Sequence, residues 1–209
     1  NEAVLKTARA WLDGVAEAAA KQDNHVKFSY YDAKLRDLMG DFKGNAERLP
    51  KLLAEYPDQN EARLLLVSAL IETNMLGQAA KHLKEATGRA QTNEQIREQV
   101  AAWQLEARLA SRRGRRDDQV VALQGVVKLR PNDELTRVRM ARLMLLDKRA
   151  QECQQTLVEG KKLGMASIAF EVALVEYWLW ANREEDALAE TVEATKKYPD
   201  SVDLLFLRG

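Results

Sequence analysis

Proline-centred turns recur along this chain at a spacing that restricts it to few folds. The segments EYPDQ (55–59), LRPND (129–133) and KYPDS (197–201) each follow a stretch with helical patterning, and Pro131 and Pro199 are 68 residues apart, twice 34. Proline ends a helix, and an Asn or Asp that follows it can cap the next one. Two helices every 34 residues is a period typical of stacked helical repeats.

The composition agrees with an all-helical chain. Only four of the 209 residues are Pro and ten are Gly. The chain is rich in Ala, Leu, Glu, Gln, Lys and Arg, which lose little rotamer freedom in a helix. Apolar stretches such as LLLV (64–67) are far shorter than the roughly 20 residues of a membrane-spanning helix, so direct membrane insertion is not expected.

The arrangement of small residues resembles the tetratricopeptide repeat (TPR) family. In that family, one small residue of helix A and two of helix B allow neighbouring helices to approach closely. If repeats begin at 26, 60, 100, 134 and 168, the three slots hold Ala33, Val67, Ala107, Ala141 and Val175; Asn45, Ala79, Gln119, Cys153 and Ala187; and Leu52, Ala86, Val126, Gly160 and Ala194. Trp103 occupies the favoured Trp site, and Gly40 and Gly114 end helix A where the family has glycine.

The resemblance implies an all-α, right-handed superhelical solenoid of antiparallel helix pairs over residues 1–209. Its expected parts are an N-terminal helix (1–25), five repeats and the truncated start of another (202–209). The five repeats are expected at 26–59, 60–99, 100–133, 134–167 and 168–201.

The C-terminal residues suggest a fragment of a larger bacterial TPR scaffold. Leu204, Leu205 and Phe206 would have no following helix to cover them. Solenoids need polar caps, so uncapped ends could self-associate as an artefact.

The second repeat is six residues longer than the others, and the additional residues lie in RAQTNEQIREQ. Thr92 and Gln95 are spaced as a capping box. This predicts a lengthened helix from about Asn93 to Arg113 that protrudes from the stack. The alternative is an insertion without a role.

No pattern in the chain indicates catalysis, a cofactor or a metal site. His25 and His82 are 57 residues apart and form no helical metal pair. Cys153 lies in a small-residue slot, where a buried structural thiol is expected rather than a nucleophile. The chain also lacks the glycine fingerprints of nucleotide-binding loops. We therefore expect a non-catalytic protein.

Five arginines fall within RLASRRGRR (108–116), but they do not predict nucleic-acid binding. The formal net charge of the chain is zero, and no aromatic residues interleave with the cluster. Arg113, Arg115 and Arg116 fall at a predicted turn, where we expect a solvated charged segment offset by Asp117 and Asp118.

The resemblance places another set of residues on the concave face of the solenoid, where TPR proteins bind partners. Arg142 is expected one repeat along from Arg108 in a short basic ladder, and Arg can bind carboxylates through two bonds. An extended peptide with acidic and apolar side chains is the predicted partner. The alternative is that these arginines pair with neighbouring Glu. The predicted binding residues are Tyr30, Lys34, Gln104, Arg108, Arg112, Arg142, Leu146, Glu176 and Trp180.

Other aromatic residues are expected to serve the core. Trp103, Trp178 and Phe170 follow the buried stripe of the helices, while Tyr177 fits either a core or a binding role. The family's lysine–asparagine clamp for a terminal carboxylate is absent from the corresponding pairs, which are Tyr30/Lys34, Leu64/Ser68 and Gln104/Arg108.

The sequence favours a protein-interaction scaffold that takes part in a larger assembly. Charge is uneven, with 15 Lys/Arg against 9 Asp/Glu in 97–162 and 4 against 9 in 163–209, and such asymmetry can orient a partner. The resemblance to bacterial repeats points to envelope or secretion machinery in the periplasm, with the cytoplasm as the alternative. Two other functions stay open: a regulatory domain that senses a ligand or nucleic acid, and a docking module of a multidomain enzyme.

Overall fold

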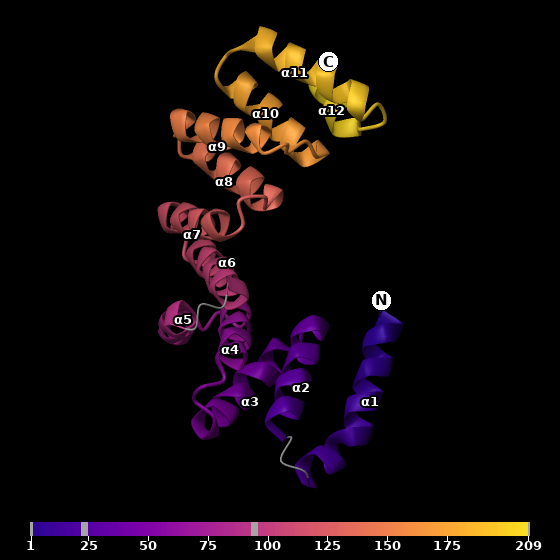
Figure 1. Ribbon diagram of the computed structural model, residues 1–209, viewed down its shortest axis with the longest axis vertical. Coiled ribbons are helices and arrows are strands. Elements are labelled where there is room, and N and C mark those ends of the chain that lie inside the picture. Colours follow the sequence, from indigo (N-terminus) through magenta and orange to yellow (C-terminus); the bar gives the residue numbers. More distant parts are fainter. Residues whose placement is uncertain (1, 22–24, 93–95, 209) are drawn as a thin grey trace. The chain divides into compact units, whose positions relative to one another are not determined.

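The computed structural model describes residues 2–21, 25–92 and 96–208. All secondary structure in these ranges is α-helical (Figure 1). The helices are α1 (Glu2–Lys21), α2 (His25–Met39), α3 (Phe42–Glu55), α4 (Asn60–Glu72), α5 (Leu76–Thr92), α6 (Ile96–Arg112), α7 (Arg116–Leu129), α8 (Glu134–Leu146), α9 (Ala150–Lys162), α10 (Ile168–Trp180), α11 (Glu184–Lys197) and α12 (Val202–Arg208). The chain is an all-α helical-repeat solenoid, as the sequence predicted.

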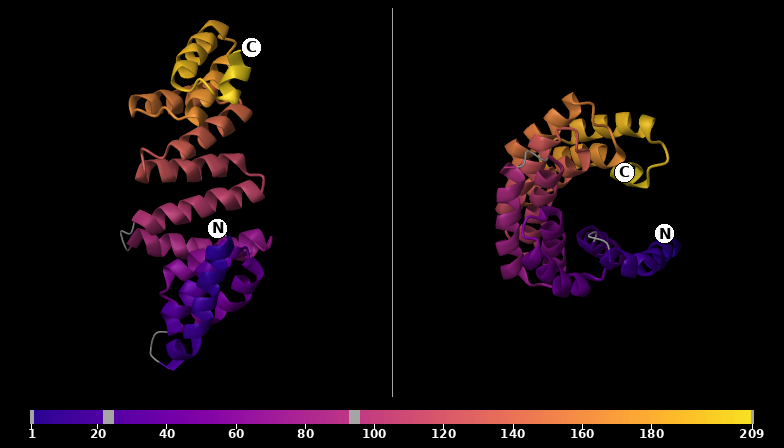
Figure 2. Two further views of the ribbon diagram at one scale, coloured as in Figure 1. Left: turned by 90° about the vertical axis from the view of Figure 1, so that its right-hand side faces the viewer. Right: turned by 60° about the horizontal axis from the view of Figure 1, so that its bottom comes forward.

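The helices form two compact units, Asn1–Arg115 and Arg116–Gly209. In the first, α4 packs against α2, α3, α5 and α6, and in the second α10 packs against α8, α9, α11 and α12. Figure 2 shows the short-looped hairpins α8–α9 and α10–α11 of the second unit from two sides. We call the even-numbered helices from α2 to α12 the A-helices and the odd-numbered ones from α3 to α11 the B-helices.

The small-residue slots of the sequence pattern lie where helices meet. All fifteen residues in them are buried. At Gly160 the approach is so close that an added Cβ atom would lie 2.6 Å from the Phe170 ring. The residues of the three slots are therefore packing positions between helices.

Every A-to-B turn has the same backbone geometry. One residue in each turn has a positive φ, and the next residue donates its N–H to the carbonyl five positions before it, as from Arg115 to Ala110 (2.9 Å). This is the Schellman arrangement that ends a helix. The positive-φ residues are Gly40, Asn74, Gly114, Lys148 and Asn182. Glycine was predicted at two of them, and the others adopt the same conformation without it.

The insertion in the second repeat lengthens two helices rather than one. Helices α5 and α6 each have 17 residues, whereas α4 and α8 have 13. Thr92 is the last residue of α5, and α6 begins at Ile96 within the described chain. The predicted helix start at Asn93 and the partner Gln95 of the capping box lie outside the described residues.

The expectation of three uncovered apolar residues at the C-terminus is wrong for one of them. Leu204 is buried against Val172 and Ala194, because α12 packs on the pair that precedes it. Leu205 and Phe206 are exposed, as predicted.

Candidate partner-binding face

One surface of the A-helices carries most of the predicted binding residues. It consists of the second, sixth, ninth and thirteenth residues of each repeat, a spacing that keeps them on one side of a helix. We call it the A-helix face. In the second unit its exposed residues are Leu135, Arg139, Arg142 and Leu146 on α8, and Ala169 and Trp180 on α10; Glu176 is half-buried and Ala173, at the sixth position of α10, is buried.

Arg142 and Glu176 join the two stripes of this face. The Nε and Nη2 atoms of Arg142 donate to the two carboxylate oxygens of Glu176 at 2.8 and 3.2 Å. Because these residues occupy equivalent positions 34 residues apart, the stripes of α8 and α10 must point to the same side. Arg142 is thus paired with a neighbouring Glu, which is the alternative that the sequence left open.

Two large apolar residues follow this ion pair, one helical turn further along each helix. Leu146 on α8 is 67% exposed, and Trp180 on α10 is 42% exposed. Leu135 at the beginning of α8 and Leu179 beside Trp180 are exposed too. An accumulation of exposed large apolar side chains is unusual for a surface that faces only water.

The A-helix face of the first unit is dominated by one carboxylate. Glu72 on α4 accepts hydrogen bonds from Arg108 and, at 2.7 Å, from Arg112, both on α6. Arg108 also donates to the Ser68 hydroxyl at 3.3 Å. Arg108 and Arg112 therefore use hydrogen-bond donors within the protein, which again agrees with the alternative that these arginines pair with Glu.

The other predicted residues of the first unit lie on α2 and α6. The Lys34 ammonium is 5.9 Å from the centre of the Tyr30 ring, close enough for a cation–π contact. Burial and the charge of Glu61 raise the pKa of Tyr30 to about 12, so its hydroxyl stays protonated. Gln104 is exposed on α6. Arg108 and Arg142 belong to different units, so the basic ladder stays a prediction.

The turn arginines are more engaged than the sequence suggested. Arg113 donates to the Leu76 carbonyl at 2.7 Å, and Arg116 pairs with Asp147 at 2.6 Å. They fasten neighbouring turns within their own units. This replaces the picture of a merely solvated charged segment.

Sequence reasoning missed three charged residues that are buried at the Trp site of the repeat. Arg63 and Arg137 take this place in α4 and α8, and each donates to the carbonyl of the preceding turn proline and to a B-helix glutamate. Glu171 takes it in α10 and accepts from Lys197 at 2.7 Å. The signal was available, because the repeat frame places all three in the slot of Trp103.

The aromatic residues expected in the core differ in how deeply they are buried. Phe170 and Tyr177 are buried, whereas Trp103 and Trp178 are only partly so. Trp178 has the guanidinium of Arg183 4.5 Å from its ring centre. Tyr177, left open by the sequence, belongs to the core.

The cysteine and the two histidines of the chain lie in packed or hydrogen-bonded positions. Burial, with the nearby charge of Glu176, raises the pKa of the Cys153 thiol to about 12, so little thiolate forms near neutral pH. His25 shares a 2.5 Å hydrogen bond with the Tyr56 hydroxyl, and burial lowers the pKa of His82. In the described ranges, no three metal-ligating side chains cluster, and no helix has the length and hydropathy to cross a bilayer.

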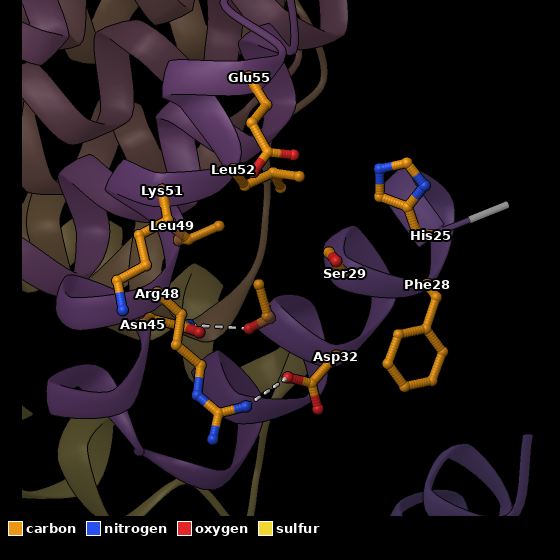
Figure 3. A pocket seen from close by; sticks show the side chains of 11 residues that line it. His25, Phe28, Ser29, Asp32, Asn45, Arg48, Leu49, Lys51, Leu52 and Glu55 are labelled. Atoms are coloured by element: carbon orange, nitrogen blue, oxygen red, sulfur yellow. Dashed lines mark hydrogen bonds and ion pairs between the residues drawn. The ribbon is translucent and has the colours of Figure 1, made fainter. Parts of the chain in front are cut away.

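A cleft of about 240 Å³ opens between α2 and α3 (Figure 3). Its polar groups serve neighbouring elements: Asp32 is 3.8 Å from Arg48 and accepts from Arg36 at 2.9 Å, and Asn45 donates to the Ala33 carbonyl at 2.8 Å. Asp32 also pairs with Arg9 of α1. The cleft therefore coincides with the polar contacts that fasten α1, α2 and α3 to one another.

Comparison with solved structures identifies the class of fold. The chain is similar to the MamA protein (13% identity, TM-score 0.67, 84% of this chain and 93% of that one). It is also similar to YrrB, a TPR protein with an unusual peptide-binding site (13%, 0.67, 91% and 95%). A tetratricopeptide repeat protein from Parabacteroides merdae aligns with 16% identity and a TM-score of 0.59 over 99% of this chain and 77% of that one. The chain has the TPR fold.

No protein-family model and no curated protein matches the sequence. At identities of 13–16%, the solved structures show the fold alone.

Proposed function

We propose that this chain is a non-catalytic protein-interaction scaffold that binds a segment of a partner protein on the A-helix face. The observation that carries the proposal is the exposure of Leu146 and Trp180 on either side of the α8–α10 contact. Large apolar side chains, Trp above all, supply much of the binding energy in protein interfaces. The charges around them fix orientation more than affinity.

The polar environment of this face supports the same function. Arg142 and Glu176 neutralise each other, so a partner need not leave either charge buried and unpaired. YrrB, which shares the fold, is a TPR protein with a peptide-binding site. A role in bacterial envelope or secretion assemblies is part of the proposal and rests on the resemblance of these repeats to bacterial ones.

Site-specific photo-cross-linking in the producing organism tests the proposal. A photo-reactive amino acid at Leu146 is expected to capture a discrete partner, and Trp180→Ala in the same chain should abolish the capture. The matched control is the same amino acid at Val121, which is 57% exposed on the B-helix α7 of the same unit. Equal capture from both positions, or capture that survives Trp180→Ala, would remove the A-helix face from consideration.

A further inference from the structure

The stripe on α8 has a pattern of its own: an apolar residue at each end and two arginines between. Leu135, Arg139, Arg142 and Leu146 follow one another at intervals of four, three and four residues. All four are exposed, with Leu135 at 74%. From Leu135 to Leu146 the stripe advances eleven residues, or about 16 Å along the helix axis, which is about three helical turns.

The two arginines keep hydrogen-bond donors to spare. Across the described residues, no carboxylate pairs with Arg139. Arg142 uses only Nε and one N–H of Nη2 on Glu176, and a guanidinium has five N–H donors. Two arginines against one glutamate leave this part of the face with one net positive charge.

We infer that the α8 stripe binds a partner helix that carries two carboxylates between two large apolar residues, spaced as i, i+4, i+7 and i+11. This inference rests on the proposed function and names the partner's chemistry. One carboxylate binds Arg139, and the other meets the free donors of Arg142. The apolar residues pack on Leu135 at one end and on Leu146 and Trp180 at the other. Charge complementarity selects a carboxylate opposite Arg139, because an uncharged helix would leave Arg139 desolvated and unpaired. The N–H donors that Arg142 does not use on Glu176 supply hydrogen bonds for the second carboxylate.

Isothermal titration with a designed probe tests the inference. The probe is an alanine-based peptide of about 15 residues, long enough to form helix, with Leu, Glu, Glu and Leu at the four spacings. Its partner probe has Gln in place of both Glu. The intact chain should bind the Glu peptide at least about tenfold more tightly than the Gln peptide, since hydrogen bonds between charged groups are worth more than neutral ones.

Variants of the protein separate charge recognition from simple apolar binding. Arg139→Gln should weaken binding of the Glu peptide by about tenfold and leave binding of the Gln peptide unchanged. Arg130→Gln is the control, because it removes the same charge from an exposed residue at the end of α7, off the stripe. Circular dichroism should show the same helicity for both variants.

Each possible result decides between the two proposals. If both peptides bind equally, or if Arg139→Gln binds the Glu peptide as the wild type does, the inferred carboxylate recognition is wrong. In that case, loss of binding in Leu146→Ala/Trp180→Ala would leave the proposed function standing. No binding of the Glu peptide would overturn the inferred partner chemistry, and the cross-linking experiment would then judge the proposed function separately.

Discussion

At the scale of single residues, buried arginines hold repeats together where the TPR pattern has an aromatic ring. Arg137 is almost fully buried, and its guanidinium lies 3.1 Å from the Pro131 carbonyl and 3.4 Å from Glu159. It thus connects the A-helix α8 with the turn before it and with the B-helix after it. Arg63 makes the corresponding contacts with Pro57 and Glu85 in the first unit. A long side chain with several donors can hydrogen-bond a turn carbonyl and a B-helix carboxylate at the same time.

Replacing Arg137 with Ala should lower the free energy of unfolding by about 1–3 kcal/mol, because the Pro131 and Thr156 carbonyls lose a charged donor. Urea denaturation followed by circular dichroism measures this loss. Arg139→Ala, two residues away and exposed, is the control and should change stability by less than about 0.5 kcal/mol. Similar effects of the two substitutions would show that the buried bonds contribute nothing.

The same residues show what the sequence could and could not predict. The slots, such as those of Ala107 and Val175, were predictable because small residues recur in most of them at the spacing of the family, although Asn45, Leu52 and Gln119 are buried in slots too. The ion pairs of Arg108 and Arg142 were predictable only as an alternative, since pairing depends on where a partner such as Glu72 comes to lie. Arg137 was missed because arginine is read as a surface residue unless its place in the repeat is considered.

At the scale of elements, the five A-to-B turns impose one backbone conformation on different residues. Lys148 has a φ of 59° in the turn between α8 and α9, where Gly114 occupies the corresponding place before α7. A left-handed conformation costs a residue with a Cβ atom roughly 1 kcal/mol. Lysine therefore carries strain at a position that glycine would occupy freely.

Lys148→Gly should raise the free energy of unfolding by about 0.5–1 kcal/mol. This gain is smaller than the full backbone strain, because glycine has more conformational entropy in the unfolded chain. Gly114→Ala should do the reverse and destabilise by about 1 kcal/mol. Thermal and urea unfolding of both variants measure the pair of effects. If Lys148→Gly destabilised the protein, contacts of the lysine side chain would have to outweigh the backbone strain.

The first helix is held by a carboxylate on the second. Asp32 on α2 accepts hydrogen bonds from Arg9 on α1 and from Arg36, which lies one turn further along α2. Burial works against its ionisation, but the hydrogen bonds from Arg36 and Arg9 outweigh burial and hold the pKa of Asp32 below its usual range. The stabilisation is present above the unfolded-state pKa of about 3.9 and is lost as pH falls through the lower folded-state pKa.

Asp32→Asn should lower stability near neutral pH and should flatten the acid branch of the stability profile below about pH 4. Amide hydrogen exchange should become faster in α1, because Arg9 loses its partner across the two helices. The matched control is Asp13→Asn, since Asp13 pairs with Arg9 only within α1. Unchanged exchange in α1 after Asp32→Asn would mean that apolar contacts such as that of Leu12 suffice.

At the scale of the whole chain, the 34-residue recurrence explains why a few side chains can form a site. Equivalent residues of the A-helices α8 and α10 lie side by side, so Arg142 reaches Glu176 and Leu146 lies one helical turn from the pair on the same side as Trp180. The insertion in the second repeat shows the limit of this reasoning. Its length was evident from the sequence, but its division between α5 and α6 depends on packing that no local pattern encodes.

Hydrogen–deuterium exchange of the intact chain, with and without the partner segment recovered by cross-linking, tests the central claim most directly. The claim is that partners bind the A-helices of the second unit and leave its B-helices bare. The account predicts slower exchange in α8 and α10 and no change in α9 and α11. Slower exchange confined to α9 and α11 would contradict it and would place the binding surface on the B-helices.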